Sequence, residues 1–483
     1  MPCAPLAPEF IAAIERAVGP SFVRRDRETL ETYGVDALKR GRPADLVVLP
    51  ASTDEVARVV RLCNEHRVPV TPRGGGTGYT GGAVPVCGGI VLSLERLNRI
   101  LRIDETSLFA VVEPNVITAD FQEAVERVGL FYPPDPASLK ESVLGGNVAE
   151  NAGGPRAFKY GVTTHWVLGL EAVLPTGEIV RTGGKTVKNV VGYDLTHLLV
   201  GSEGTLAVIT KITMRLIPKP PVQATLRATF PSVAHAARAV TGLIRRRVVP
   251  AALELVDGDC LEAVARYLNV TSLAPPGTAA LLLVEVDGLA ELVAGEAARV
   301  EDACRDAGAT EVLRAKDEAE RQELWRVRRE LSPSLKVLSP LKFNHDVVVP
   351  KARIPELFEL VDRLRRESGL RMPCFGHVGD GNIHVNVIVD PDSLDEQARG
   401  HRAERALFEG VVALEGSISG EHGIGFAKAK YLGIELTPDE IALMKRVKRA
   451  FDPNGILNPG KIFPDEAMEP PATRAAGPVE SES

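Results

Sequence analysis

A run of glycines directly after a short apolar segment restricts the fold of this chain more than any other feature. The run is Arg73-Gly74-Gly75-Gly76-Thr77-Gly78-Tyr79-Thr80-Gly81-Gly82, and it follows a strand predicted at residues 68–71. Glycine tolerates positive φ and lets backbone N–H groups approach a ligand closely. Successive N–H groups of this kind form a nest that suits a pyrophosphate, with Arg73 and Thr77 as additional donors. The alternative is a tight loop with a structural role only.

The run differs from two common phosphate-binding motifs. No helix-forming stretch follows Gly82, as a Rossmann fingerprint requires, and the GK[ST] of a P-loop is absent. A second glycine-rich stretch covers residues 145–154, after a stiff, proline-rich turn at 133–138, and a third lies at 201–206. Two loops of small residues fit the two sides of a long, flat ligand, so these stretches favour the ligand-binding interpretation.

The length and the hydrophobic pattern predict more than one domain. A chain of 483 residues with 45% hydrophobic content is too long for a single ordinary core. The first half alternates strands and helices, including a helix from Thr53 to about His66, and prolines at 218, 220 and 221 end it. In the second half, strands alternate with long helices, for instance at 232–247 and 395–414, which predicts an antiparallel sheet covered by helices. The expected fold class is therefore α+β.

Composition excludes several kinds of protein. The net charge of -7 gives no electrostatic case for binding nucleic acid. No CxxC pair occurs among the six cysteines, so a zinc ribbon or an iron–sulfur site is not expected; they lie at positions 3, 63, 87, 260, 304 and 374. The N-terminus lacks the pattern of a signal peptide, and no run of about 18 apolar residues predicts a membrane span. We expect a cytoplasmic enzyme.

Two short motifs in the second half place three of the nine histidines beside a carboxylate. His377 and His384 flank a Gly-Asp-Gly-Asn turn, which folds two strands into a hairpin and brings the histidines together. Downstream, glycines on both sides present Glu421 and His422 in a tight turn. Two histidines and one carboxylate can bind a divalent metal and leave positions open for a substrate. The spacing equally allows a hydrogen-bonded hairpin with one catalytic histidine and no metal.

The glycine-rich stretches together resemble the FAD-binding domain of the vanillyl-alcohol oxidase/p-cresol methylhydroxylase superfamily, over roughly residues 40–220. The whole chain is similar to the group of glycolate oxidase D-subunits, D-lactate dehydrogenases and D-2-hydroxyglutarate dehydrogenases. The resemblance implies FAD, with its pyrophosphate on residues 74–78. Some superfamily members attach the flavin covalently through a histidine in this loop. This loop has Thr77 and Tyr79 instead, so we expect non-covalent FAD.

The resemblance also predicts which residues contact FAD. They are Arg73, Gly74, Gly75, Gly76, Thr77, Gly78, Gly81, Gly82, Pro134, Asp135, Ser138, Gly145, Gly146, Asn147, Ala149, Asn151, Gly153, Gly154, Gly161, Glu203, Gly204, Ile209 and Asn458.

The expected organisation has four parts. A two-part FAD-binding domain of the p-cresol methylhydroxylase type covers residues 1–220, and a substrate or cap domain covers 221–425. A C-terminal helical segment at 426–463 returns to the FAD-binding domain. The last residues, 464–483, are rich in proline, alanine, glutamate and serine, which predicts a disordered tail.

Family resemblance gives roles to individual residues of the second half. Related dehydrogenases carry zinc or a similar ion on residues that match His377, His384 and Glu421. Asn386 and His422 stand beside this ion, and the pKa of histidine suits His422 to the role of general base near neutral pH. Two cations, Arg328 and Lys342, match the groups that hold the substrate carboxylate. Arginines on helices are usually solvated, so the role of Arg328 follows from the resemblance.

The sequence thus predicts FAD-dependent oxidation of a small D-2-hydroxy acid to the 2-oxo acid. The acid is D-lactate, glycolate or D-2-hydroxyglutarate. One alternative is an alditol- or ether-lipid-type member of the superfamily, and another is an FAD-carrying electron-transfer subunit without activity of its own. The expected partners are an electron-acceptor protein, a quinone or an iron–sulfur subunit; a homodimer and a peripheral position at the inner face of the membrane stay open.

Overall fold

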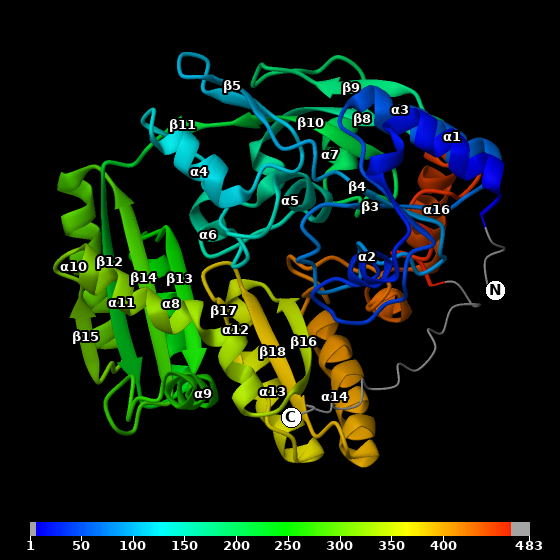
Figure 1. Ribbon diagram of the computed structural model, residues 1–483. Coiled ribbons are helices and arrows are strands. Elements are labelled where there is room, and N and C mark those ends of the chain that lie inside the picture. Colours follow the sequence, from blue (N-terminus) through cyan, green and yellow to red (C-terminus); the bar gives the residue numbers. More distant parts are fainter. Residues whose placement is uncertain (1–5, 465–483) are drawn as a thin grey trace, which may run out of the picture.

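The computed structural model describes residues 6–464, so all but the first residue of the predicted tail lies outside the described residues. The half that the sequence predicts to bind FAD, up to residue 220, is called the FAD-binding half below. It contains two main sheets (Figure 1). The first consists of β1 (Val23–Arg24), β2 (Leu46–Val48), β4 (Ile90–Ser93) and β3 (Val70–Arg73), in this order. The second consists of β5 (Ile100–Asp104), β6 (Phe109–Val112), β10 (Val208–Arg215), β8 (Val167–Val173) and β9 (Ile179–Gly183). Two short strands, β7 (Leu130–Phe131) and β11 (Ile217–Pro218), form a separate pair.

Short helices connect and flank these sheets. They are α1 (Pro8–Val18), α2 (Arg27–Tyr33), α3 (Thr53–His66), α4 (Thr118–Glu126), α5 (Leu144–Glu150), α6 (Ala157–Tyr160) and α7 (Leu195–Leu199). Helix α3 forms where its pattern predicts it. Ser52 Oγ accepts from Glu55 N at 3.2 Å and caps the helix, and its apolar stripe packs on the β2–β4–β3 sheet.

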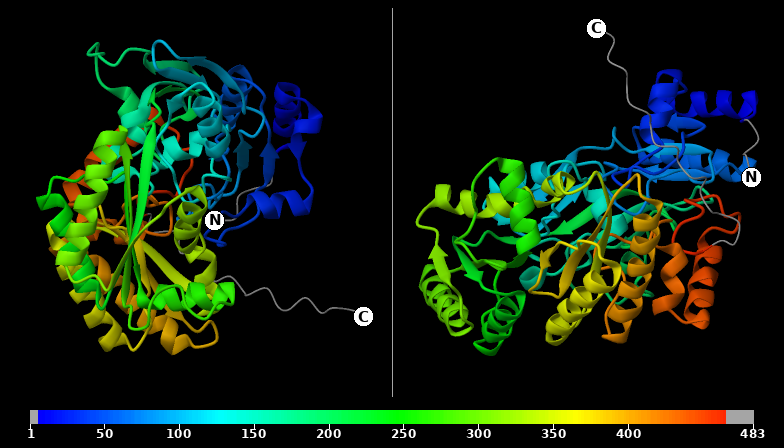
Figure 2. Two further views of the ribbon diagram at one scale, coloured as in Figure 1. Left: turned by 90° about the vertical axis from the view of Figure 1, so that its left-hand side faces the viewer. Right: turned by 90° about the horizontal axis from the view of Figure 1, so that it is seen from below.

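The cap half is built on one seven-stranded antiparallel sheet. Its strands, in order across the sheet, are β15 (Glu311–Arg314), β12 (Val222–Phe230), β14 (Ala280–Gly288), β13 (Ala252–Asp257), β17 (Cys374–His377), β18 (Asn382–Val389) and β16 (Leu341–Val348). Four long helices cover one face and enclose the largest hydrophobic core, and Figure 2 shows them aligned along one side. They are α8 (Val233–Arg245), α10 (Ala290–Asp306), α13 (Ile354–Ser368) and α14 (Leu394–Ala413). This arrangement confirms the predicted helix-covered α+β cap.

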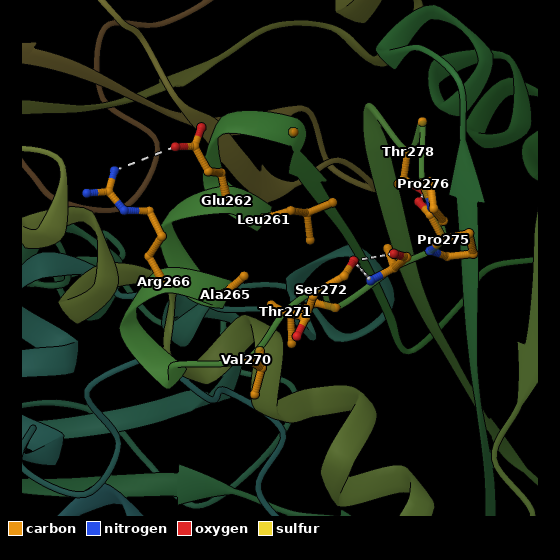
Figure 3. Close-up of a pocket in the computed structure, with 14 residues that line it drawn as sticks. Leu261, Glu262, Ala265, Arg266, Val270, Thr271, Ser272, Pro275, Pro276 and Thr278 are labelled. Carbon is orange, nitrogen blue, oxygen red and sulfur yellow. Dashed lines mark hydrogen bonds and ion pairs between the residues drawn. The ribbon is translucent and has the colours of Figure 1, made fainter.

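The other face of the cap sheet is covered only in part. Helices α9 (Gly258–Leu268), α11 (Glu318–Arg329) and α12 (Leu331–Ser334) pack on it around Leu283 and Phe375. A pocket of about 310 Å³ lies between α9 and residues 270–278 (Figure 3). None of the predicted site residues lines this pocket.

The chain returns to the FAD-binding half at its C-terminal end. The elements α15 (Leu432–Glu435) and α16 (Pro438–Phe451) come first. Leu457 then forms a parallel bridge with Val70 of β3 and joins the hydrophobic core between α3 and the first sheet. Val447 and Phe451 of α16 pack against the core around the second sheet.

One predicted loop contains a helix. The glycine-rich stretch at 145–154 begins as α5, and Asn151, at φ 53°, ends the helix in the left-handed conformation. A Cβ on Gly145 would lie 2.5 Å from Pro114 Cβ, so the glycine lets the helix lie directly against that segment. Asn147 is buried, and its Nδ2 donates to Thr118 Oγ1 at 2.8 Å. Packing against these neighbours therefore outweighs the low helix propensity of the two glycines.

Candidate active site

One face of the cap sheet carries the polar residues of the second half. Phe375 lies opposite His384, and His377 lies opposite Asn382. Asp346 lies opposite His384 on its other side. Because paired residues project from the same face of a sheet, these side chains gather on the face away from the four long helices. The sheet thus brings together groups that are distant in the sequence.

His377, His384 and Glu421 form a compact cluster at this face. His377 Nε2 and His384 Nε2 each lie 3.5 Å from Glu421 Oε1, and one ligand atom of each residue lies within 4.8 Å of the others. Both histidines are buried. Burial alone would raise the pKa of Glu421, but attraction to His377 and the other histidines outweighs it and brings the pKa to about 2. Two imidazoles facing a charged carboxylate fit a divalent metal.

Glu254, which the sequence analysis did not single out, holds His377 from the other side. His377 Nδ1 donates to Glu254 Oε1 at 2.6 Å, and Arg328 Nε donates to Glu254 Oε2. Because Nδ1 is used in this way, Nε2 is the ring nitrogen of His377 that faces Glu421. A carboxylate behind a histidine is the usual support of a metal-binding imidazole.

Asp346, likewise missed, organises the Glu421–His422 turn. Its Oδ2 accepts from the backbone N–H groups of Gly420, Glu421 and His422 at 2.7–2.9 Å. Its Oδ1 pairs with Lys428 and lies 3.3 Å from His422 Nδ1. The His422 ring lies 5.3 Å from the ring of His384 and 5.2 Å from that of Tyr79. His422 thus lies between the cluster of His377, His384 and Glu421, called the metal-type cluster below, and the glycine-rich loop of the FAD-binding half.

The two predicted cations lie on the same side of the cap. Arg328 is buried at the end of α11, with its guanidinium carbon 5.0 Å from the centre of the Phe375 ring. Lys342 is in β16, where burial lowers its pKa to about 8; its Nζ donates to Ser332 O at 3.5 Å. Asn386 is fully buried, and its Oδ1 has no hydrogen-bond partner among the described residues.

The glycine-rich segments of the first half pack against one another. A Cβ on Gly74 would lie 2.6 Å from Val143 Cγ2, and one on Gly82 would lie 2.7 Å from Glu150 Oε1. Gly76 and Gly81 have φ of +67° and +81°, which favours glycine. Within residues 6–464, the N–H groups of residues 75–79 have no protein acceptor. Such free donors are what a pyrophosphate requires, so the loop fits FAD.

The Arg73 side chain contacts the glycine-rich loop on the side of Val35. Its Nη1 donates to Val35 O at 2.7 Å, and a Cβ on Gly76 would meet its guanidinium at 2.2 Å. Sequence reasoning treated Arg73 as an additional phosphate donor. In the structure, this side chain fixes the position of the loop.

Polar contacts join the FAD-binding half to residues 420–425, which we call the His422 turn. Thr80 Oγ1 donates to His422 O at 2.9 Å, and Glu203 accepts from Ile424 N and Gly425 N at 2.8 and 2.6 Å. A Cβ on Gly153 would lie 2.9 Å from Glu421 Oε2. The predicted flavin segments and the metal-type cluster therefore share one site.

Other predicted FAD contacts act on this framework or line it. Asn458 Nδ2 donates to Gly82 O at 2.9 Å and to Glu203 O at 2.8 Å, while its buried Oδ1 has no hydrogen-bond partner among the described residues. Asp135 Oδ1 accepts from Arg156 N at 3.1 Å, and burial raises the pKa of Asp135 to about 6.

A third residue missed by the sequence analysis, Glu150, ends α5 inside this framework. Its buried Oε2 has no hydrogen-bond partner within the described chain, and burial raises its pKa well above the ordinary value. The available signal for Glu150, Glu254 and Asp346 was a carboxylate inside an otherwise small or apolar segment, which normally costs free energy unless it is paired or has a function.

Comparison with known proteins identifies the family. The model described as "FAD binding domain" matches residues 44–183, and the one described as "FAD linked oxidases, C-terminal domain" matches residues 219–462. The chain is 43% identical to glycolate oxidase subunit GlcD of Bacillus subtilis (strain 168), covering 88% of this chain and 90% of the relative. It is 37% identical to D-lactate dehydrogenase of Anaerostipes hadrus, covering 95% and 98%.

Among solved structures, p-cresol methylhydroxylase with substrate bound matches with a TM-score of 0.79 at 19% identity, over 95% of this chain and 97% of that one. This likeness shows a common fold. Together, the matches confirm the predicted superfamily and FAD-dependent oxidoreductase class. The chain belongs to the FAD-linked oxidases.

Proposed function

We propose that this chain oxidises a small D-2-hydroxy acid, namely D-lactate, glycolate or D-2-hydroxyglutarate, to the 2-oxo acid. One observation carries the proposal: a metal-type cluster, a histidine backed by a carboxylate and a buried arginine converge on one face of the cap sheet. This face adjoins the glycine-rich segments of the FAD-binding half. Such a set of groups suits a substrate that carries both a hydroxyl and a carboxylate.

In this proposal, His422 removes the hydroxyl proton of the substrate. Histidine suits a base that works near neutral pH. Asp346, 3.3 Å from Nδ1, keeps the ring oriented and stabilises its protonated form. Nε2 then faces the substrate side, 4.0 Å from Glu421 Oε1, and receives the proton.

The cofactors supply the remaining chemistry. FAD, held by the glycine-rich segments, would supply a two-electron acceptor for the α-hydrogen, which would leave the substrate carbon as hydride while the carbonyl forms. His377, His384 and Glu421 would hold a divalent metal, expected to be zinc, which would lower the pKa of the substrate hydroxyl as a Lewis acid.

Arg328 and Lys342 would hold the substrate carboxylate. A guanidinium can bind a carboxylate with two parallel hydrogen bonds and fix its orientation. The contact with Glu254 and the stacking on Phe375 set the plane of the Arg328 guanidinium. The buried Asn386 oxygen provides a further acceptor in this region.

FAD would be held non-covalently, since no histidine occurs in the glycine-rich loop at residues 73–82. The proposal keeps the predicted division into a FAD-binding domain at 1–220, a cap at 221–425 and a returning segment at 426–463. The contacts of Leu457 and Asn458 with the FAD-binding half support this last assignment.

Reduced flavin must pass two electrons to an acceptor. We favour a partner protein, including an iron–sulfur subunit, over a quinone, because one relative is named a subunit of glycolate oxidase. The alternative function follows from the same name: the chain would carry FAD and transfer electrons without independent activity. Within residues 6–464, no helix is both long and apolar enough to cross a bilayer. We propose a cytoplasmic position, or a peripheral one at the inner membrane face through a partner.

The decisive experiment is anaerobic bleaching of the bound flavin. D-lactate, glycolate, D-2-hydroxyglutarate and L-lactate would each be mixed with the purified protein, and one D-acid or glycolate should bleach the flavin. The His422→Ala variant should lose bleaching by about 10²- to 10⁴-fold while its flavin absorbance stays. His401→Ala, at a half-exposed position on α14, is the control. Failure of all four acids would favour the subunit alternative, and full bleaching by His422→Ala would exclude the proposed base.

A further inference from the structure

The loop between β9 and α7, residues 184–194, exposes an unusual amount of apolar surface. Val187 is 75% exposed, Val190 96%, Val191 91% and Tyr193 95%. The loop extends away from the body of the FAD-binding half (Figure 2, left). Isolated exposed apolar residues are common, but four within one short loop mark a binding surface.

The apolar surface continues at the base of this loop. Leu195 and Leu198 of α7 are both more than one-third exposed. Beside them lies a crevice of about 490 Å³, between β9, α7 and the end of α16. Its apolar lining includes Val180, Leu199 and Phe451. We call the loop, the two leucines and this crevice the β9–α7 surface.

Positive charges surround the β9–α7 surface. Lys185 and Lys188 lie in the loop, and Arg449 is exposed near the end of α16. Among the described residues, Lys188 and Arg449 form no ion pair. Of the acidic groups on these elements, Asp194 pairs with His197, while Glu178, at the edge of the crevice, accepts from the neutral Thr176 hydroxyl and keeps its charge. The three cations outnumber this one carboxylate, and the balance favours a partner that presents carboxylates.

Helix α7 connects this surface to the proposed flavin site. Only Val200 separates it from Gly201–Gly204, where Glu203 contacts the His422 turn and Gly204 is a predicted FAD contact. The β9–α7 surface is thus joined through one short helix to a segment of the proposed flavin site.

We propose that the β9–α7 surface docks the protein that accepts electrons from the reduced flavin. The partner would have an apolar groove for Val190, Val191 and Tyr193, with carboxylates at its rim, and a flavin or iron–sulfur centre of its own. A partner flavin would take both electrons, or iron–sulfur centres would take them one at a time in two steps; reduced flavin would return to FAD, and the released proton would go to solvent. The inference rests on the proposed function, since only an oxidase that reduces its flavin needs such an acceptor.

A protruding loop fits a groove better than it fits a flat surface, and a partner protein is therefore favoured over a lipid bilayer. An apolar loop with lysines can also enter an anionic membrane, and a second copy of the chain could cover it. These two occupants are outcomes that the test must separate.

The test starts with a photo-reactive benzophenone amino acid in place of Val190, incorporated in the full chain in its native cells. The cross-linked product should contain a redox protein, which is then purified. This protein should reoxidise the substrate-reduced enzyme, and Val190→Glu with Val191→Glu should slow that reaction by about tenfold or more. Reduction of the dye dichlorophenolindophenol and flavin bleaching should not change.

Leu289→Glu with Leu292→Glu, at apolar positions 59% and 63% exposed at the start of α10, is the control and should have no effect. The proposal is overturned if the cross-link joins two copies of the chain or no redox protein, or if the Val190/Val191 pair leaves reoxidation unchanged. Binding to phosphatidylglycerol vesicles that the Val190/Val191 variant loses would assign the surface to a membrane instead. Flavin that no hydroxy acid bleaches would contradict the proposed function, whereas the cross-link reports on the surface alone.

Discussion

At Glu254, one buried carboxylate holds two functional side chains at once. One oxygen accepts from His377, and the other accepts from Arg328. Burial would raise the pKa of Glu254, but attraction to His377 and Arg328 outweighs it and brings the pKa to about 2. The group is therefore ionised at neutral pH, and it couples the orientation of a proposed metal ligand to that of the proposed carboxylate-binding cation.

The Glu254→Gln variant should bind the proposed metal about 10- to 100-fold more weakly, because the His377 imidazole loses the carboxylate that orients it. Metal content after dialysis against graded zinc concentrations, read by elemental analysis, measures the change. Glu285→Gln is the control, since Glu285 is a buried carboxylate on the neighbouring strand that contacts Trp325 instead. Equal metal affinity in Glu254→Gln and the unmodified chain would show that Glu254 has no orienting role.

Lys342 should give the reaction an upper pH limit. Burial lowers its pKa to about 8, so the side chain is charged below that pH and loses its charge as the pH rises through it. If Lys342 holds the substrate carboxylate, kcat/KM should fall above about pH 8, since this ratio reports on the free enzyme. In Lys342→Gln, kcat/KM should be lower throughout and this fall should disappear. A fall that persists in the variant would assign it to another group.

Among the secondary-structure elements, α5 shows most clearly what packing decides. Its glycines lie against Pro114 and Val143, and side chains larger than hydrogen would separate segments that form the FAD site. The opposite case is Gly295, in the middle of α10, where an added Cβ would meet nothing within 4 Å. Packing therefore requires a glycine at position 145 but not at position 295.

Alanine at these two positions should act with opposite signs. Gly145→Ala should destabilise the protein by about 1–3 kcal/mol, because its Cβ would overlap Pro114. Gly295→Ala should stabilise it by about 0.4–1 kcal/mol, because alanine restricts the unfolded chain and favours the helix. Urea unfolding followed by circular dichroism measures both. A stabilising Gly145→Ala would mean that α5 can move away from Pro114 at little cost.

Sequence patterns located the elements with a strong local signal. The period and cap of α3, the hairpin between His377 and His384, and most cap strands and helices were predictable from nearby residues, whereas β15 and α9 were not predicted. The helical state of α5 was not, since its stability comes from Pro114 and Thr118. Glu254 and Asp346 were missed for the same reason: their partners lie 123 and 76 residues away in the sequence. The roles of the predicted site residues stay predictions.

Over the whole molecule, the FAD-binding half and the cap meet through the His422 turn and the C-terminal segment. Glu203 holds the turn, and Asn458 holds both Gly82 and Glu203. A residue near the end of the chain thus joins the first glycine-rich segment to the third.

Asn458→Ala should weaken FAD binding without changing the fold. Two hydrogen bonds of about 1 kcal/mol each, which hold the glycine-rich segments in place, would be lost, so Kd should rise by up to about thirtyfold. Fluorescence of released flavin on dilution measures this change. Asn454→Ala is the control, since the Asn454 side chain donates to Asn64 Oδ1 and not to the glycine-rich segments. Unchanged flavin retention in Asn458→Ala would mean that Gly82 and Glu203 keep their positions without this link.

The bridge between Val70 and Leu457 has a consequence for folding during translation. Strand β3 leads into the glycine-rich loop, yet its neighbour on one side is made almost four hundred residues later. While the ribosome is still translating, the nascent chain has an open edge where the flavin site will be. Domains generally fold in order of synthesis, but the FAD-binding half cannot complete the edge of β3 until the C-terminal segment has been synthesised. Flavin loading should therefore be a late, post-translational event, and a prematurely terminated chain should leave the ribosome colourless.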